Sequence, residues 1–169
     1  MSTVRAPSRA SPPAKSKVFG LIPLSRFYQG QKATPLGRRF SQFWAGWAAL
    51  GLPSFRMVQL ELRGPKTGKP LRLAVVLVRH ASQQYLVAML GECAWVRAAR
   101  ANPDATIVKF RRRQVRLAEV PVQERAAIIQ AFLRVAPGGR PHIGLGAQAT
   151  MEECDEIAAR HPVFRVVPR

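Results

Sequence analysis

The chain has 169 residues, 47% of them hydrophobic, which is enough for one domain with an apolar core. Its 27 Lys and Arg residues face nine acidic residues, giving a formal charge of +18. Residues 1–60 contain nine basic and no acidic residues, residues 61–116 twelve against three, and residues 117–169 six of each. The basic excess of the first two thirds therefore predicts an anionic partner there.

Several classes of protein are disfavoured by simple features of the chain. The longest uncharged run, Phe40–Phe55, has sixteen residues and contains Gly and Pro, so it is too short to span a bilayer. No secretory signal fits, because the apolar patch Val18–Leu24 is brief. Cys93 and Cys154 have neither metal-ligand spacing nor the density of a disulfide framework. These features indicate a cytoplasmic protein.

The N-terminal third divides into two parts. Residues 1–17 are rich in Ser, Pro, Ala and basic residues, which predicts a disordered tail. In the segment 18–55, an amphipathic helix is predicted over residues 36–50, because apolar residues recur there at helical spacing: Leu36, Phe40, Phe43, Trp44 and Trp47. Such a helix either covers one side of a barrel or lies on an anionic membrane, which its Trp residues beside Arg38 and Arg39 would suit.

Residues 56–169 carry the signals of one mainly β domain. Six strands are predicted: Met57–Leu62, Leu71–Val78, Tyr85–Leu90, Thr106–Phe110, Gln114–Glu119 and Phe164–Val167. Helices are predicted at Trp95–Asn102, at Gln123–Val135 and from the N-cap Thr150 to about Arg160, with a loop at Pro137–Gly146. Antiparallel strands with a few helices at their edges favour an α+β fold, a small β-barrel with flanking helices.

The most informative segment is the turn Gly64-Pro65-Lys66-Thr67-Gly68-Lys69-Pro70, with Arg72 just beyond it. Two glycines and two prolines predict a tight turn between strands, and its backbone N–H groups and cations would suit a phosphate. The segment is not a nucleotide-binding P-loop, because a strand follows where that motif needs a helix.

A second candidate segment runs from Leu90 and Gly91 into the helix at Trp95. Arg97 and Arg100 are three residues apart and share one helical face. Trp95 belongs either to the core or to a cofactor wall. The tip Arg111–Arg113 is interpreted as a solvated basic loop, and with no aromatic interleaved for base stacking, nucleic-acid binding is disfavoured.

Side chains for acid–base or metal chemistry are sparse. His80, His142 and His161 lie apart in the sequence, and no carboxylate pair occurs in the basic two thirds. We therefore expect no metal site, assign no catalytic residue, and expect a bound cofactor to carry any reaction.

These segments, in order, resemble the deazaflavin-dependent nitroreductase family of split β-barrel oxidoreductases. The resemblance covers about residue 40 to the C-terminus and rests on seven further motifs: Leu90-Gly91-Glu92, Trp95-Val96-Arg97, Arg100-Ala101-Asn102-Pro103, Val115-Arg116-Leu117-Ala118-Glu119-Val120, Glu124-Arg125, Ala136-Pro137-Gly138-Gly139-Arg140-Pro141-His142 and His161-Pro162-Val163-Phe164-Arg165. It implies a split β-barrel that binds the 8-hydroxy-5-deazaflavin coenzyme, factor 420, which carries a phosphate and a polyglutamate tail.

The resemblance also implies which residues hold the coenzyme. In the family the K-[ST]-G-[KR] turn holds the phosphate, which maps to Lys66, Thr67, Gly68 and Lys69, with Arg72 nearby. The deazaflavin ring would lie along Leu90, Gly91, Trp95 and Arg97. An Asn common in the family is Ala98 here, and a Pro is Ala74. The missing Asn would remove a polar contact, and restoring it is expected to strengthen coenzyme binding.

The resemblance implies a deazaflavin-dependent oxidoreductase that passes hydride to a small hydrophobic or quinone-like acceptor. One alternative is a binding protein of the same fold with little turnover, or one that uses FMN. A basic nucleic-acid-binding module is a second alternative. The resemblance also implies a homodimer, while contact with an anionic membrane through residues 36–50 would place the protein at the inner face of the membrane.

Overall fold

A computed structural model describes residues 17–18, 22–23, 28–29, 32–33, 56–65 and 68–169. The first four pieces are two-residue strands, β1 (Lys17–Val18), β2 (Ile22–Pro23), β3 (Tyr28–Gln29) and β4 (Lys32–Ala33). They form two antiparallel pairs, β1 with β2 and β3 with β4. The predicted helix at 36–50, and the predicted tail except for Lys17, lie outside the described residues.

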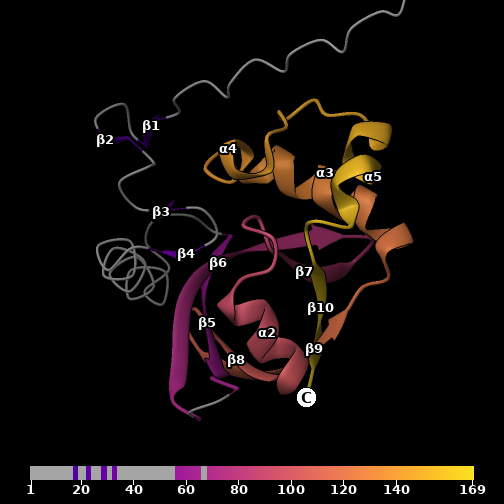
Figure 1. The fold of residues 1–169 in the computed structure, drawn as a ribbon. Helices are drawn as coiled ribbons and strands as arrows, with labels where there is room; N and C mark the ends of the chain where they lie inside the picture. Colours follow the sequence, from indigo (N-terminus) through magenta and orange to yellow (C-terminus); the bar gives the residue numbers. More distant parts are fainter. Residues whose placement is uncertain (1–16, 19–21, 24–27, 30–31, 34–55, 66–67) are drawn as a thin grey trace, which may run out of the picture.

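The rest of the described chain is built on a closed six-stranded antiparallel barrel (Figure 1). Its strands are β5 (Met57–Arg63), β6 (Pro70–His80), β7 (Gln83–Val87), β8 (Asp104–Val108), β9 (Arg112–Glu119) and β10 (Val163–Pro168). Their order around the barrel is β10-β7-β6-β5-β8-β9, and β9 closes on β10. The predicted fold, a mainly β barrel with flanking helices, is confirmed.

The barrel interior follows from the alternation of residues along its strands. On β5, Val58, Leu60 and Leu62 are buried while the residues between them keep some exposure, as expected for a strand with one face in a core. Helix α2 (Ala94–Ala101) packs against β5 and adds its own buried side chains to this core. Trp95 of α2 contacts Phe164 of β10, with ring centroids 5.3 Å apart. The helix therefore fills one side of the barrel.

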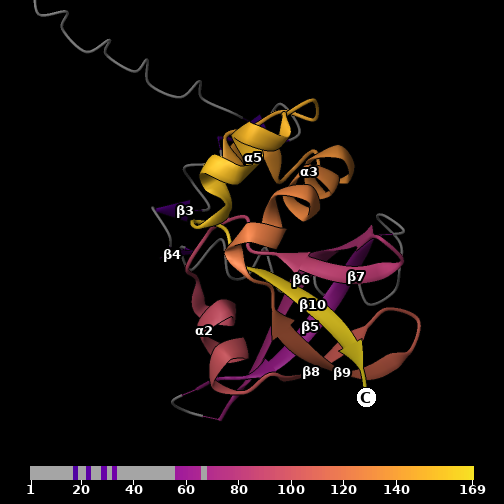
Figure 2. The same cartoon turned by 90° about the vertical axis from the view of Figure 1, so that its right-hand side faces the viewer.

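A second apolar core lies between the barrel and a layer of helices. This layer contains the short 3₁₀ helix η2 (Val122–Glu124), α3 (Arg125–Val135), α4 (Arg140–Ile143) and α5 (Met151–Ala158). Helix α3 packs against α5 and against β6, and both figures show the two helices together on the side of the barrel away from the C-terminus (Figures 1 and 2). The buried cluster joins Val78 and Val163 of the barrel to Ile129 and Leu133 of α3.

Most predicted elements are confirmed with shifted ends, and two details differ. Pro137–Gly146 was expected to be a loop, but α4 forms inside it, with Pro141 in its first turn and Gly144 (φ +84°) after its end. Phe110 was expected to end a strand, but β8 stops at Val108 and Phe110 is exposed in the following turn. Thr150 does cap α5: its hydroxyl accepts from the Glu153 N–H, and the Glu153 carboxylate accepts from the Thr150 N–H.

Candidate functional site

The turn between β5 and β6, Gly64–Pro70, is called here the cradle turn. Its base is closed by two backbone bonds, from Gly64 N to the Lys69 carbonyl (2.9 Å) and from Gly68 N to the Gly64 carbonyl (3.0 Å). Gly68 has φ +63°, which favours glycine, and a Cβ added there would meet nothing within 4 Å. The predicted tight turn is confirmed, although Lys66 and Thr67 lie outside the described residues.

The described cations of the cradle turn lie at the surface. Lys69 is exposed, and Arg72 is exposed on β6, where it faces Glu61 of β5 across the strand pair. The Arg72 Nε lies 3.1 Å from Glu61 Oε1, and Arg112 of β9 bonds the other Glu61 oxygen. Two arginines thus share one carboxylate, so this group of three keeps a net positive charge beside the turn.

The second candidate segment begins where β7 ends. The Gly91 N–H donates to the Ala88 carbonyl (2.9 Å), and Gly91 is buried with φ +67°. The same carbonyl lies 3.1 Å from Nδ1 of buried His161, and because a carbonyl only accepts, Nδ1 carries the proton. Burial is the main cause that lowers the pKa of His161, which favours the neutral ring. The glycine turn is therefore fixed by the segment just before β10, and this His161 contact was not predicted.

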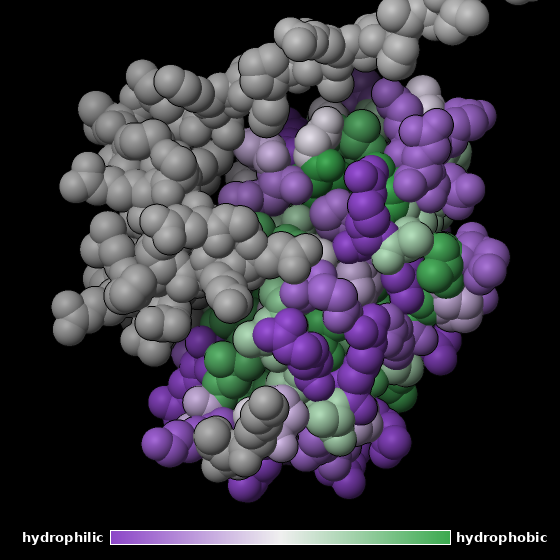
Figure 3. Space-filling view, in the orientation of Figure 1, coloured by the Kyte–Doolittle hydropathy of each residue, from purple (hydrophilic) through white to green (hydrophobic). Residues whose placement is uncertain are grey.

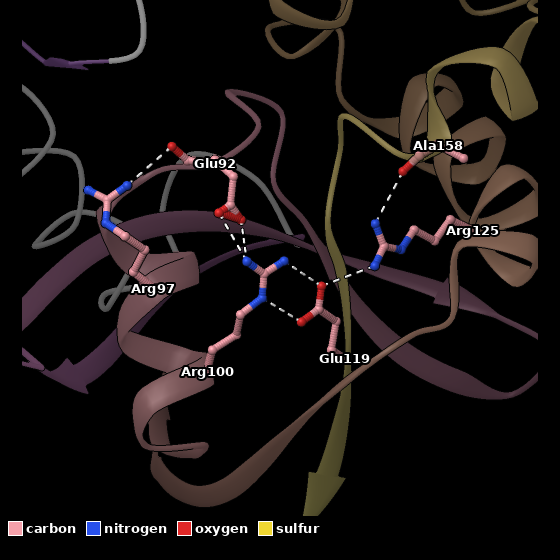
Figure 4. A network of polar contacts seen from close by, with 6 residues as sticks. All are labelled: Glu92, Arg97, Arg100, Glu119, Arg125 and Ala158. Atoms are coloured by element: carbon pink, nitrogen blue, oxygen red, sulfur yellow. Dashed lines mark hydrogen bonds and ion pairs between the residues drawn. The ribbon is translucent and has the colours of Figure 1, made fainter.

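A chain of charged side chains connects this turn to β9, α3 and α5 (Figure 4). We call it the guanidinium network, and it consists of Glu92, Arg97, Arg100, Glu119 and Arg125. Arg100 bonds both carboxylates, with Nη1 2.5 Å from Glu92 Oε1 and Nε 2.6 Å from Glu119 Oε2. Its guanidinium lowers the pKa of the Glu119 carboxyl, and Arg125 adds to that effect. Arginine contacts thus favour the ionised form of Glu119, and Arg100 pairs Glu92 with Glu119.

The network becomes more buried from one end to the other. The Arg100 side chain is 43% exposed, Glu119 is 28% exposed and Arg125 is 7% exposed. Buried Arg125 bonds Glu119 and two backbone carbonyls, those of Val120 (2.8 Å) and Ala158 (3.2 Å). Arg125, at the buried end of the network, therefore holds α3, β9 and α5 together, whereas Arg100 lies at the surface.

Helix α2 has a charged, exposed face and an apolar, buried face. Arg97 and Arg100 are exposed, as their spacing predicted, and Arg97 Nη1 lies 3.4 Å from the Glu92 carbonyl oxygen. In the face shown in Figure 3, hydrophilic residues gather over α2 and β10. Trp95 faces inward and is buried against Phe164, which supports the core interpretation of this residue.

Ala98 also faces inward, where it has no exposed surface. It lies in the apolar barrel core with Val96 and Ala99. An Asn at this position would place its amide among apolar side chains, so the expected gain in coenzyme binding is not supported by the fold.

The two cysteines and His142 are buried or half-buried. Burial raises the pKa of the Cys93 and Cys154 thiols, which favours the unreactive protonated form. Half-buried His142 has its pKa lowered by burial. Within the described part of the chain, no group of three His, Cys, Asp or Glu side chains could hold a metal ion. Nor does that part contain a helix long and apolar enough to cross a membrane.

The structure thus divides the predicted site residues between two connections of the barrel. Gly68, Lys69 and Arg72 lie at the β5–β6 connection. Leu90 and Gly91 lie between β7 and α2, and Trp95 and Arg97 lie on α2. Leu77 of β6 pairs with Leu86 of β7, so seven residues of β6 separate this register from Pro70, a span of about 23 Å. The pairings of Glu119 and Arg125 carry no local sequence signal, because Arg100 lies 19 residues from Glu119.

Comparison with known proteins identifies one family. A sequence model described as F420H(2)-dependent quinone reductase matches residues 34–141, that is 108 of 169 residues. No curated protein sequence matches the chain.

Several solved structures are similar to this chain at low identity. A structure described as a domain-swapped dimer has 15% identity and a TM-score of 0.49 over 78% of this chain and 96% of that one. A FAD-binding protein from Mesorhizobium loti has 16% identity and a TM-score of 0.46, over 76% and 90%. An F420-H2 dependent reductase, FDR-A, has 17% identity and a TM-score of 0.47, over 66% and 93%.

Proposed function

The chain belongs to the F420H(2)-dependent quinone reductase family, and we propose that this F420-dependent reductase passes hydride to a small, hydrophobic, quinone-like acceptor. The reduced coenzyme supplies the hydride when it is bound. Reduction of a quinone to its hydroquinone then needs one proton, which solvent water provides. The protein itself is left to bind, orient and shield the two reactants.

The residues of the cradle turn fit the anionic part of the coenzyme. Exposed Lys69 and Arg72 would pair with its phosphate, together with Lys66 and Thr67 of the same turn. The open space beside Gly68 leaves room for a ligand to approach the backbone. The single observation that carries the proposal is this basic, glycine-containing turn within the segment that matches the family.

The ring of the coenzyme would lie toward Leu90, Gly91 and the exposed Arg97. Strand β6 leads from the cradle turn at Pro70 to its pairing with β7 at Leu77 and Leu86. Between these ends, alternate apolar residues of β6 remain partly exposed: Leu71, Leu73, Val75 and Leu77. This strip favours an apolar ring and an apolar acceptor beside it.

The alternative is a protein that binds the coenzyme, or FMN, with little turnover. The resemblance suggests it through Ala98, which stands where the family commonly has Asn, but the burial of Ala98 in the apolar core removes that support. A homodimer, a cytoplasmic location and contact of residues 36–50 with an anionic membrane also remain proposals, and the last concerns residues outside those described.

The first experiment is a fluorescence titration of the full chain with factor 420, run beside FMN at fixed salt. We expect saturable binding of the deazaflavin and weak binding of FMN. Lys69→Gln should weaken deazaflavin binding by roughly tenfold, the effect of losing one charge-assisted hydrogen bond. Arg160→Gln, an exposed cation after α5, is the matched control and should leave binding unchanged.

Turnover is then measured as oxidation of the reduced coenzyme, with and without a soluble quinone. Oxidation that depends on the quinone supports the reductase proposal. Tight binding with no quinone-dependent oxidation would support the carrier alternative instead. Equal affinity of wild type and Lys69→Gln would remove the cradle turn from the proposed site.

A further inference from the structure

The turn between β8 and β9 carries the most exposed large apolar side chain of the described residues. Phe110 is 74% exposed, compared with 46% for Met151 and 38% for Val122. Lys109 and Arg111 flank it, and Arg112 and Arg113 follow at the start of β9. Figure 2 shows this hairpin projecting from one side of the barrel. An aromatic residue thus lies at a projecting tip among four cations.

The barrel fixes the tip from two sides. Arg112 bonds Glu61 of β5, and Arg113 Nη2 bonds Gln84 of β7 at 2.7 Å. The Lys109 Nζ lies 5.8 Å from the centroid of the Phe110 ring. These contacts hold Arg112 and Arg113 against the barrel and place Lys109 over one face of the ring, while most of the Phe110 side chain stays exposed.

The charge of this end has one sign. The Arg113–Gln84 bond brings the β6–β7 hairpin beside the tip, and that hairpin adds exposed Arg79. Residues 79–84 and 108–114 together contain five Lys or Arg residues and no acidic residue. Glu61 lies underneath, with only 13% of its side chain exposed. A partner that meets this surface must be anionic and must accept one aromatic ring.

We propose that the β8–β9 tip, Lys109–Arg113, is a docking surface for anionic lipid, with Phe110 inserted among the headgroups. Aromatic rings and basic side chains occur together at membrane interfaces, where cations meet anionic headgroups and the ring reaches the acyl boundary. Single-stranded nucleic acid fits less well, because successive bases need several stacking rings and Phe110 is the one exposed aromatic among the described residues.

This surface lies in the β8–β9 hairpin and includes none of residues 36–50. Its use rests on the proposed function: docking would bring a reductase of apolar quinones to the phase in which such acceptors dissolve. Binding to vesicles and reduction of a quinone are measured separately, so failure of one can be distinguished from failure of the other.

The test uses the full chain and vesicles of phosphatidylglycerol or of phosphatidylcholine, with bound protein measured by sedimentation. Phe110→Ser should lower partition onto phosphatidylglycerol roughly tenfold, since it removes the one aromatic side chain that would be buried among the lipids. Arg111→Gln should lower it about fivefold, the effect of one cation at an anionic surface. The matched controls Met151→Ser and Arg160→Gln change an exposed apolar residue and an exposed cation elsewhere, and should leave partition unchanged.

Four results would overturn the proposal. Equal partition of wild type and Phe110→Ser, or equal binding to neutral and anionic vesicles, would show that the tip does not insert among anionic lipids. Variants that lose affinity for factor 420 but keep vesicle binding would assign the tip to the coenzyme's anionic tail. Variants that lose affinity for single-stranded RNA, with no vesicle binding by wild type, would assign it to nucleic acid.

Discussion

The cradle turn and the guanidinium network both concentrate basic side chains, but they hold them differently. In the cradle turn, Lys69 and Arg72 are exposed, and their neighbour Glu61 is shared with Arg112. In the network, Arg125 is buried and bonds one carboxylate and two carbonyls. An exposed cation can be reached by an anionic ligand from solvent, whereas buried Arg125 already donates to three acceptors inside the protein. The first arrangement suits binding and the second suits positioning.

The largest expected difference between the two regions is in stability. Arg125→Ala should lower the free energy of unfolding by about 3 kcal/mol, because it leaves Glu119 and two buried carbonyls short of a donor. Arg72→Ala removes a cation that is 58% exposed, and should cost less than about 1 kcal/mol. Urea denaturation of both variants measures this. Equal losses would contradict the division between binding and positioning cations.

A second prediction concerns the inner face of α2, which connects the network to the barrel core. Ala98→Asn should lower the free energy of unfolding by about 2 kcal/mol, because a larger, polar side chain enters a filled apolar core. Coenzyme affinity, measured by fluorescence titration below the melting temperature, should not rise. Tighter binding with unchanged stability would restore the polar contact that the family resemblance implies for this position.

The sequence predicted the barrel better than the connections between its charges. Alternation along Met57–Leu62 and the glycines and prolines of the cradle turn are local signals, and both predictions are confirmed. The tip Arg111–Arg113 is exposed, as predicted, but no local signal indicated that Arg112 bonds Glu61, 51 residues away, or that Arg113 bonds Gln84. Such partners are set by strand register, which composition and periodicity do not determine.

The site residues on α2 also depend on contacts that the sequence does not reveal. Helical periodicity placed Arg97 and Arg100 on one face of α2, but it could not assign Trp95 to core or site. That choice depends on which face of α2 contacts β5 and β10, a tertiary contact between segments far apart in sequence.

Two glycines offer a matched test of how rigid each region must be. Gly91 and Gly68 both have positive φ, but Gly91 is buried and bonded to Ala88, whereas Gly68 is exposed beside open space. Gly91→Ala should cost about 1.5 kcal/mol of stability and Gly68→Ala about 1 kcal/mol, the usual penalty of a left-handed residue with a Cβ. Thermal melts compare the two, and a larger loss at Gly68 would mean that the cradle turn is the more constrained region.

The smallest effect concerns acid sensitivity of the network. Arginine contacts lower the pKa of folded Glu119, so its contribution to stability is present above the pKa of the unfolded chain and is lost as the pH falls through the folded pKa. Wild type should therefore exceed Glu119→Gln by about 1 kcal/mol at neutral pH, with the gap closing in acid below about pH 4. Urea denaturation across this range measures the gap, and Glu124→Gln, an exposed carboxyl in η2, controls for the loss of one charge. A gap that stays constant with pH would mean that the Gln variant loses packing rather than an ionised carboxylate, and the network would then position α2 by shape instead of charge.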